Sequence, residues 1–280
     1  MENLPENNMF QSTFFENIPD VIRWKNKKII DVSGISISSK SMENKNVFLA
    51  LNGARYRGSQ FIAEAISNGA ELIISEVLVS EVTYIQSLIQ KYPHVVFLQV
   101  RDGMSFLQKL TKAWVDYWKS QDSNNFLIGI AGSNGKTTSK EMIYHLLDKI
   151  FPGKVLATQG NFNNHVGVPL TLLNLRQKHR IGVIELGTNQ KGDIDSLTDL
   201  FPPDAGLLTN IGPEHLEGPG SIEGVFEEEF TLYKKFLTNP NKKIFVLNGN
   251  DYYLSKVESD AYTYKFTGSL KNQCVHLNIK

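Results

Sequence analysis

An apolar strand, a glycine-rich turn and the start of a helix follow one another without interruption in residues 126–138 (FLIGIAGSNGKTT). Glycines let successive backbone N–H groups converge on phosphate oxygens, and the N-terminus of the following helix adds partial positive charge. In such a loop Lys136 would reach the β- and γ-phosphates of a nucleotide, and the Thr137 hydroxyl would bind Mg²⁺. The sequence therefore predicts a nucleotide site made of Gly132, Ser133, Asn134, Gly135, Lys136, Thr137 and Thr138.

This loop departs from the strict pattern G-x-x-x-x-G-K-[ST] at one position. Ile130 stands where the first glycine is expected, and glycines fall instead at positions 129, 132 and 135. A glycine-rich turn that binds nothing is the alternative interpretation, but the strand, loop and helix context favours a nucleotide. ATP is favoured over GTP, although the loop itself does not distinguish the two.

Strand-like apolar runs alternate with helical segments from residue 126 onward. Strands are expected at 126–131, 181–186, 205–209 and 243–247, with helices near 136–150, 193–200 and 222–237. Because each strand is an unbroken apolar run, we expect an α/β fold whose mainly parallel sheet is covered on both faces. This pattern predicts a central domain over residues 126–266 that resembles a P-loop NTPase.

A smaller α/β pattern precedes this domain. It has strand-like runs at 47–51, 71–75 and 95–98 and helical spacing at 61–68 and 104–118. We expect an N-terminal α/β domain over residues 21–122, a polar linker at 120–125, and a loose lead-in over residues 1–20. Residues 267–280 are expected to be a tail or the beginning of a further domain.

Composition excludes several classes of protein. Lysine plus arginine and aspartate plus glutamate both number 29, so no net charge favours a nucleic-acid or membrane partner. The single cysteine, Cys274, excludes an intrachain disulfide and fits a reducing compartment. No signal peptide and no apolar run of the ~20 residues needed to span a bilayer is found. We therefore expect a cytoplasmic protein.

Two polar residues, one at the end of a predicted strand and one after a predicted strand, are candidates for a metal site. Glu185 lies in the strand at 181–186, where an unpaired buried carboxylate would be costly, so a cation partner is expected. His215 follows the strand at 205–209, at the edge where α/β sheets bind ligands. A hydrogen-bonded structural histidine is the alternative for His215, and it is the favoured interpretation for His165.

Four segments resemble the Mur ligases, in the same order and at plausible spacing. They are residues 132–138 (GSNGKTT), 159–173 (QGNFNNHVGVPLTLL), 183–194 (VIELGTNQKGDI) and 208–221 (LTNIGPEHLEGPGS). Together they span most of residues 126–250. The second and fourth segments are most similar to the subgroup that adds D-alanyl-D-alanine to a UDP-N-acetylmuramoyl tripeptide.

The resemblance implies an ATP-dependent ligase that forms an amide bond. In this family ATP phosphorylates a nucleotide-linked carboxylate to an acyl phosphate, and an amino acid or dipeptide then displaces the phosphate. Mg²⁺ ions accompany ATP, and the resemblance implies that Glu185 and His215 bind metal beside Thr137, with Lys136, Glu185 and His215 as the catalytic residues. Asn163 and Asn164 would face the substrate and the phosphates.

One departure from the family concerns the metal site. The family usually has a lysine, modified to a carbamate that bridges toward the second metal ion, at the position of Glu229. A glutamate supplies similar oxygen ligands on a shorter arm, so it is a candidate metal ligand, although the second metal site could equally be weakened. A solvated acidic helix face formed by Glu227, Glu228 and Glu229 is the alternative.

Further departures concern the N-terminal domain and the length of the chain. Residues 37–40 (ISSK) stand where the UDP-binding subgroup of the family typically has Asp-Ser-Arg, which leaves Ser39 as a candidate substrate contact. Residues 55–59 (RYRGS) stand where Asp-Gly-His is usual. The family continues into a third domain that helps hold ATP and brings the amine. Three hypotheses stay open: the tripeptide ligase, a Mur-like paralogue for a different carboxylate, and a nucleotide-binding subunit that is inactive alone. By itself this chain is expected to bind ATP without completing ligation.

Overall fold

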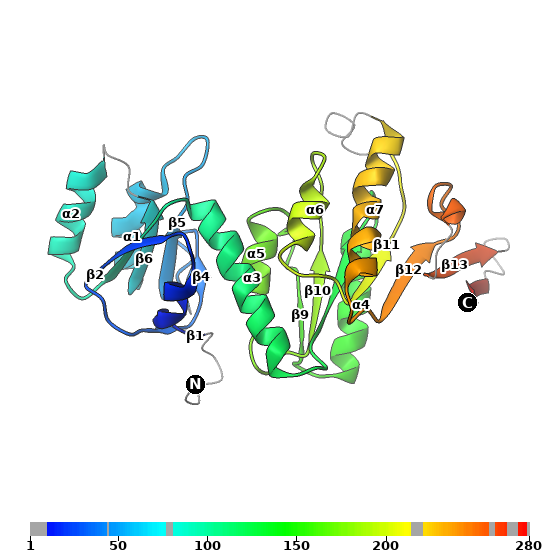
Figure 1. Cartoon of the computed structure of the whole chain (residues 1–280), viewed down its shortest axis with the longest axis horizontal. Helices are drawn as coiled ribbons and strands as arrows, with labels where there is room; N and C mark the ends of the chain where they lie inside the picture. The colour runs from blue at the N-terminus through cyan, green and yellow to red at the C-terminus, as the bar shows by residue number, and fades with distance from the viewer. Residues whose placement is uncertain are drawn as a thin grey trace. The chain divides into compact units, whose positions relative to one another are not determined.

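The computed structural model describes residues 10–43, 45–76, 81–213, 221–257, 261–267 and 274–278. The chain forms two compact units. Unit 1 comprises Met1–Val115 with Leu172–Arg176, and unit 2 comprises Asp116–Thr171 with Gln177–Lys280. Each unit is built around its own sheet, and the division in the sequence falls within helix α3 (Gly103–Gln121) (Figure 1).

Unit 1 contains a five-stranded sheet in the order β2-β7-β6-β5-β4. These strands are Val21–Lys25 (β2), Ile35–Ser36 (β4), Val47–Ala50 (β5), Leu72–Glu76 (β6) and Val96–Val100 (β7). Strands β4 to β7 run parallel, and the edge strand β2 pairs antiparallel with β7. The apolar runs therefore predicted β5, β6 and β7 to within two residues, whereas the short β4 and the mixed sequence of β2 gave no such signal.

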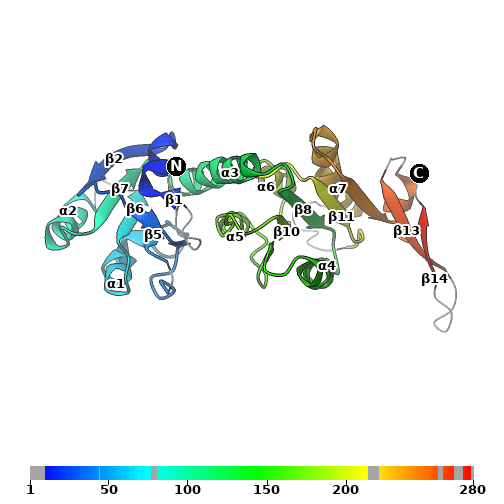
Figure 2. The ribbon, with the colours of Figure 1, turned by 90° about the horizontal axis from the view of Figure 1, so that it is seen from below.

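Both faces of this sheet are covered. Helices α1 (Ile62–Ser67) and α2 (Val82–Lys91) lie on one side, where their apolar residues pack on β5, β6 and β7 (Figure 2). Aromatic residues cover the other side. The Phe15 ring lies 5.9 Å from that of Phe106 in α3 and 6.5 Å from that of Trp24 in β2.

The prediction of a loose lead-in over residues 1–20 is wrong where the structure describes that segment. Residues 10–17 form strand β1 (Phe10–Gln11) and a short 3₁₀ helix, η1 (Ser12–Asn17), and β1 pairs with β3 (Asp31–Val32). Phe10 is 2% exposed, and its ring lies 5.2 Å from that of Trp114. Burial of these aromatic rings orders a segment whose flanking Asn and Pro residues suggested a loop.

Unit 2 contains a seven-stranded sheet in the order β14-β13-β12-β11-β8-β10-β9. Its strands are Phe126–Ala131 (β8), Val155–Ala157 (β9), Ile181–Glu185 (β10), Ala205–Leu208 (β11), Ile244–Asn248 (β12), Tyr262–Thr267 (β13) and Cys274–Asn278 (β14). All neighbouring strands pair in parallel except β13 and β14, which are antiparallel. This sheet confirms the expected α/β fold with a mainly parallel sheet.

Helices cover both faces of this second sheet. Helix α4 (Lys136–Ile150) packs on β8, β9 and β10, and helices α6 (Asp193–Thr198) and α7 (Ile222–Thr238) lie on the opposite side (Figure 2). Successive residues of β8 face opposite sides of the sheet. Ile130 is buried in the cluster under α4, while Gly129 faces Leu232 of α7. Ile130 therefore belongs to the core of the strand, and the loop begins only after Ala131.

The register of three strands places their carboxyl ends at one level. Glu185 of β10 pairs with Ile130 of β8, and Leu208 of β11 pairs with Ala131. Because β8 lies between β10 and β11, the segments that leave these strands meet at one edge of the sheet. This is the edge at which open α/β sheets bind ligands.

Candidate active site

The phosphate loop connects β8 to α4, and Gly132 sets its path. Gly132 has φ +120°, and a side-chain Cβ at this position would lie 2.3 Å from Thr209 Oγ1. Only glycine combines that backbone conformation with so close a neighbour. This explains why the glycine falls at 132, next to the turn, while position 130 holds a core isoleucine.

The loop is fixed to the segment that follows β11. Asn210 Oδ1 accepts a hydrogen bond from the Asn134 backbone N–H (3.0 Å), and Asn210 Nδ2 donates to the Asn134 carbonyl (2.7 Å). The Ser133 hydroxyl in turn accepts from the Gly212 N–H at 2.9 Å. These contacts between residues 133–134 and residues 210–212 hold the loop in shape without using a side chain of α4.

Lys136 begins helix α4 and folds back over the loop. Its Nζ donates to the carbonyl oxygens of Gly132 (2.5 Å) and Ser133 (2.8 Å). The ammonium group therefore lies within the loop, where a nucleotide phosphate would be expected. The backbone N–H groups at the start of α4 add the partial positive charge of a helix N-terminus.

Glu185 ends β10 and lies against the loop. Glu185 is 1% exposed, and its Oε1 accepts hydrogen bonds from Thr137 Oγ1 and Asn163 Nδ2, each at 3.0 Å. Oε2 is buried and has no hydrogen-bond donor among the described residues. The strand end, the phosphate loop and the 159–165 segment thus meet at one carboxylate, which has an unsatisfied oxygen.

These groups line a polar cavity of about 360 Å³. Its walls are residues 133–138 of the loop and of α4, Asn161, Asn163 and Asn164, and the end of β10 with residues 187–189. Gly187 allows the Asn163 side chain to approach the backbone closely, because a Cβ at position 187 would lie 2.8 Å from Asn163 Cγ. The sequence-predicted residues Ser133 to Thr138, Asn163, Asn164 and Glu185 are therefore brought together, and Gly132 lies at the base of the same loop.

The two asparagines differ in what they do. Asn163 binds Glu185, whereas Asn164 Oδ1 accepts from the backbone N–H groups of Val166 (3.1 Å) and Gly167 (2.9 Å). Asn164 therefore caps α5 (Gly167–Leu172) as well as lining the cavity. The neighbouring His165 pairs with the buried Asp193 at 2.8 Å, as expected of a structural histidine.

The alternative of a solvated acidic face on α7 is wrong for Glu228 and Glu229. They are 4% and 2% exposed, because they pack against the start of α6 and the phosphate loop, whereas Glu227 is exposed. Glu229 Oε2 accepts a hydrogen bond from the Gly132 backbone N–H at 2.7 Å. Glu228 accepts from the N–H groups of Gly192 and Ile194 at the start of α6. Glu229 thus contacts the phosphate loop itself.

The last two predicted residues are His215 and Ser39. His215 lies outside the described residues. Ser39 lies in unit 1, where it is 6% exposed and its hydroxyl donates to Glu64 Oε2 at 2.5 Å. The Ser39 hydroxyl is therefore already engaged by a carboxylate of its own unit.

Sequence reasoning missed three residues that shape the site: Lys140, Thr158 and Asn210. Lys140 is fully buried, and its Nζ donates to the Thr158 carbonyl at 2.7 Å. The available signal for Lys140 was its spacing of one helical turn from Lys136, which places both on one face of α4. The available signal for Asn210 was its position directly after an apolar strand.

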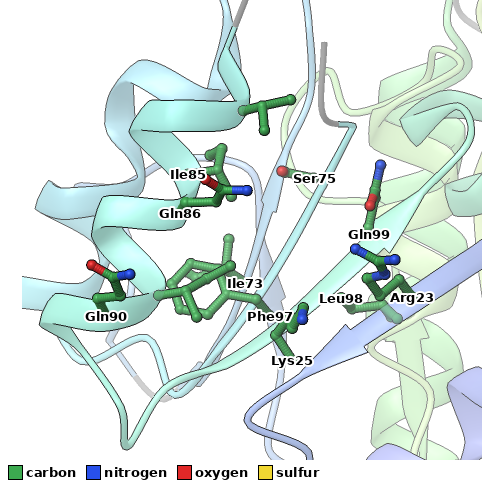
Figure 3. Close-up of a pocket in the computed structure, with 12 residues that line it drawn as sticks. Arg23, Lys25, Ile73, Ser75, Ile85, Gln86, Gln90, Phe97, Leu98 and Gln99 are labelled. Carbon is green, nitrogen blue, oxygen red and sulfur yellow. The ribbon is translucent and has the colours of Figure 1, made fainter. Parts of the chain in front are cut away.

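Unit 1 contains a separate groove of about 380 Å³ between α2 and strands β2, β6 and β7 (Figure 3). Ile73, Ile85 and Phe97 contribute apolar surface to it. Polar side chains from β2 and α2 also line it, namely Arg23, Lys25, Gln86 and Gln90. No residue predicted from the sequence as a site residue lies in this groove.

The chain matches two family models. Residues 130–277, more than half of the chain, match the Mur ligase middle domain, and residues 31–114 match the Mur ligase family catalytic domain. The chain belongs to the Mur ligase family. Mur ligases are ATP-dependent, in agreement with the ATP expected from the loop.

This Mur ligase chain is similar to curated enzymes named UDP-N-acetylmuramoyl-tripeptide--D-alanyl-D-alanine ligase. The Bacillus subtilis enzyme is 35% identical over 201 residues, which are 72% of this chain and 40% of that protein. The Escherichia coli enzyme is 30% identical over 223 residues, 79% of this chain and 44% of that protein. The chain thus spans less than half the length of these relatives.

Solved structures of MurF share the fold of this Mur ligase chain. MurF from Acinetobacter baumannii matches with a TM-score of 0.76 at 23% identity, covering 98% of this chain and 61% of that one. MurF ligase from Thermotoga maritima, in complex with ADP, matches with a TM-score of 0.64 at 27% identity, covering 88% and 56%. Among the residues that the structure describes, no helix has the length and apolar character needed to cross a membrane.

Proposed function

We propose that this chain carries the ATP site and the acyl-substrate site of a ligase that joins D-alanyl-D-alanine to a UDP-N-acetylmuramoyl tripeptide. The observation that carries the proposal is the Glu185 carboxylate, buried at a strand end and hydrogen-bonded to both Thr137 of the phosphate loop and Asn163. The names of the curated relatives supply the substrates.

Nucleotide phosphates would occupy the cavity beside the loop. Lys136 would exchange its two loop carbonyls for phosphate oxygens, and the backbone N–H groups at the N-terminus of α4 would donate to the same oxygens. Asn210 and Glu229 contact the loop from outside and would keep its shape while Lys136 moves. The ADP complex of the Thermotoga maritima relative supports this proposal.

Mg²⁺ fits the donors present at the cavity. Glu185 offers a buried oxygen without a hydrogen bond, and the Thr137 hydroxyl lies 3.0 Å from the other oxygen of the same carboxylate. Mg²⁺ takes oxygen ligands and usually keeps water and phosphate oxygens among them, so one carboxylate and one hydroxyl suffice. When bound, the ion would neutralise charge on the phosphates during transfer. His215 and Glu229 stay proposed as further metal ligands.

The proposed chemistry has two steps, and the residues of this chain serve the first. A carboxylate oxygen of the tripeptide attacks the γ-phosphorus, the bond to the β,γ-bridging oxygen breaks, and ADP leaves. The amine nitrogen of the dipeptide then attacks the acyl carbon, loses a proton and displaces phosphate. Lys136 and the loop N–H groups would stabilise the transferring phosphoryl group. Asn163 would hold Glu185 in place between loop and substrate.

The test is the phosphoryl-transfer half reaction. The 280-residue chain is incubated with Mg-ATP and UDP-N-acetylmuramoyl tripeptide, with and without D-alanyl-D-alanine, and ADP and product masses are followed. We expect ADP to form only when the tripeptide is present. Glu185→Gln should lose this ADP formation while retaining nucleotide binding, and Glu227→Gln, which alters an exposed residue of α7, should behave as the parent chain does.

Two other outcomes would replace the proposal. ATP binding without any tripeptide-dependent ADP would favour a nucleotide-binding subunit. ADP formation with another nucleotide-linked acid, but not with the tripeptide, would favour a Mur-like ligase for a different carboxylate. The engaged hydroxyl of Ser39 is the observation that favours this second candidate, because a substrate would have to compete with Glu64 for it.

A further inference from the structure

Lys140 is a charged side chain for which the proposed chemistry has no use. It lies on α4 and has 0% exposure, and lysine is almost never fully buried unless it is paired. Its Nζ donates to the Thr158 carbonyl (2.7 Å) and lies 2.8 Å from Glu141 Oε1. Glu141 is half exposed, so this pair does not by itself explain why the ammonium group is taken out of water.

The same ammonium group lies close to the candidate metal ligand. Lys140 Nζ is 4.0 Å from Glu185 Oε2, the oxygen that lacks a hydrogen-bond donor among the described residues. The other oxygen, Oε1, is held by Thr137 and Asn163. Opposite charges at this separation inside a protein attract strongly. The two oxygens of Glu185 are therefore held by different groups, one by hydrogen bonds and one by a charge.

Thr158 joins the lysine and the glutamate through a second route. Its carbonyl accepts from Lys140, and its hydroxyl accepts from the backbone N–H of Glu185 at 3.0 Å. The chain then continues directly into the 159–165 segment, which includes Asn163. Lys140 thus connects the nucleotide-binding helix, the end of β10 and the start of the segment proposed to face the acyl substrate.

We propose that Lys140 is a positioning residue whose buried charge holds the Glu185 carboxylate in the orientation that binds the Mg²⁺ of the nucleotide. This inference rests on the proposed function, because it assigns Glu185 to Mg²⁺. Lys140 would touch neither the phosphates nor the ion. Groups that orient a metal-binding carboxylate commonly change metal affinity or activity by roughly 10–100-fold when they are altered.

The experiment measures ADP affinity of the 280-residue chain by calorimetry, with Mg²⁺ and with EDTA. In the parent chain Mg²⁺ should tighten ADP binding. In Lys140→Met the affinity in EDTA should stay within about twofold of the parent, while the tightening by Mg²⁺ should fall by roughly 10–100-fold. Lys149→Met, at an exposed position on the same helix, should leave both values unchanged.

Two further variants separate charge from packing. Lys140→Gln is neutral but can still donate a hydrogen bond to the Thr158 carbonyl, so it should fold even if the methionine variant does not, and it should also lose the Mg²⁺ effect. Lys140→Arg keeps the charge and should therefore retain most of the Mg²⁺ effect. Retention of the full Mg²⁺ effect in a folded Lys140→Gln chain would overturn the proposal. Absence of a Mg²⁺ effect in the parent chain would instead count against the proposed metal site.

Discussion

The Glu229 carboxylate accepts a hydrogen bond from the backbone N–H of Gly132 at 2.7 Å, which ties helix α7 to the first residue of the phosphate loop. The two residues are 97 positions apart in the sequence. At the position where relatives are expected to have a modified lysine, this chain therefore has a carboxylate that uses one of its oxygens, Oε2, to shape the loop.

Replacing Glu229 should reveal this contact in the stability of the chain. Glu229→Ala leaves a buried N–H without its acceptor, so the free energy of unfolding should fall by about 1–3 kcal/mol. Glu229→Gln can still accept from Gly132 and should lose less. Chemical denaturation measures both values. Equal losses in the two variants would show that the hydrogen bond is not what Glu229 contributes.

The charge of Lys136 should matter for nucleotide and little for the fold. Lys136→Ala should abolish detectable Mg-ATP binding in calorimetry, because the ammonium group lies within the loop that would surround the phosphates. The thermal transition of the nucleotide-free chain should move little, since water can replace the ammonium group at two carbonyls. Lys149→Ala is the matched control on the exposed side of α4. An unchanged ATP affinity in Lys136→Ala would contradict the assignment of residues 132–138 as the loop that binds the nucleotide phosphates.

Gly132 should be far less tolerant of alanine than another glycine with positive φ. At Gly132 an added Cβ meets Thr209 Oγ1 at 2.3 Å, whereas at Gly153, with φ +68°, it meets nothing within 4 Å. Gly153→Ala should cost only the left-handed backbone penalty, about 1–2 kcal/mol. Gly132→Ala should cost more and also weaken nucleotide binding. Similar unfolding free energies for the two variants would contradict the close approach of loop and β11.

Asp193 should make the stability of unit 2 depend on pH in the acid range. Burial alone would raise its pKa, but hydrogen bonds from the Asn189 N–H, His165 and the Gln190 N–H outweigh burial and hold the pKa below its ordinary value of 3.8. A pKa lowered by folding stabilises the chain above the unfolded-state pKa, and this contribution is lost as the pH falls through the folded-state pKa.

Asp193→Asn should therefore lower the free energy of unfolding by about 1–3 kcal/mol at neutral pH. The difference from the parent chain should shrink as the pH falls below about 4. Urea denaturation across that range is the measurement. A difference that is constant with pH would mean that the contribution of Asp193 does not depend on its charge.

Much of the fold follows from local sequence. The strand, turn and helix of residues 126–138 are contiguous, so their glycines, Lys136 and Thr137 could be recognised without knowing what surrounds them. Unbroken apolar runs predicted β8, β10, β11 and β12, because strands buried on both faces need apolar side chains on both. The position of Glu185 at the end of such a run was enough to predict its burial, whereas its metal partner stays a prediction.

The tertiary structure alone decided which distant groups complete the site. Contacts of Glu229 with Gly132, of Asn210 with Asn134 and of Lys140 with Glu185 each join segments that are far apart in the sequence. They depend on the order and register of β10, β8 and β11, which place three strand ends at one level. Apolar patterning predicts that a residue is in a strand and not which strand lies beside it. A charged helix residue such as Lys140 therefore looks solvated in the sequence until the sheet beneath it is assembled.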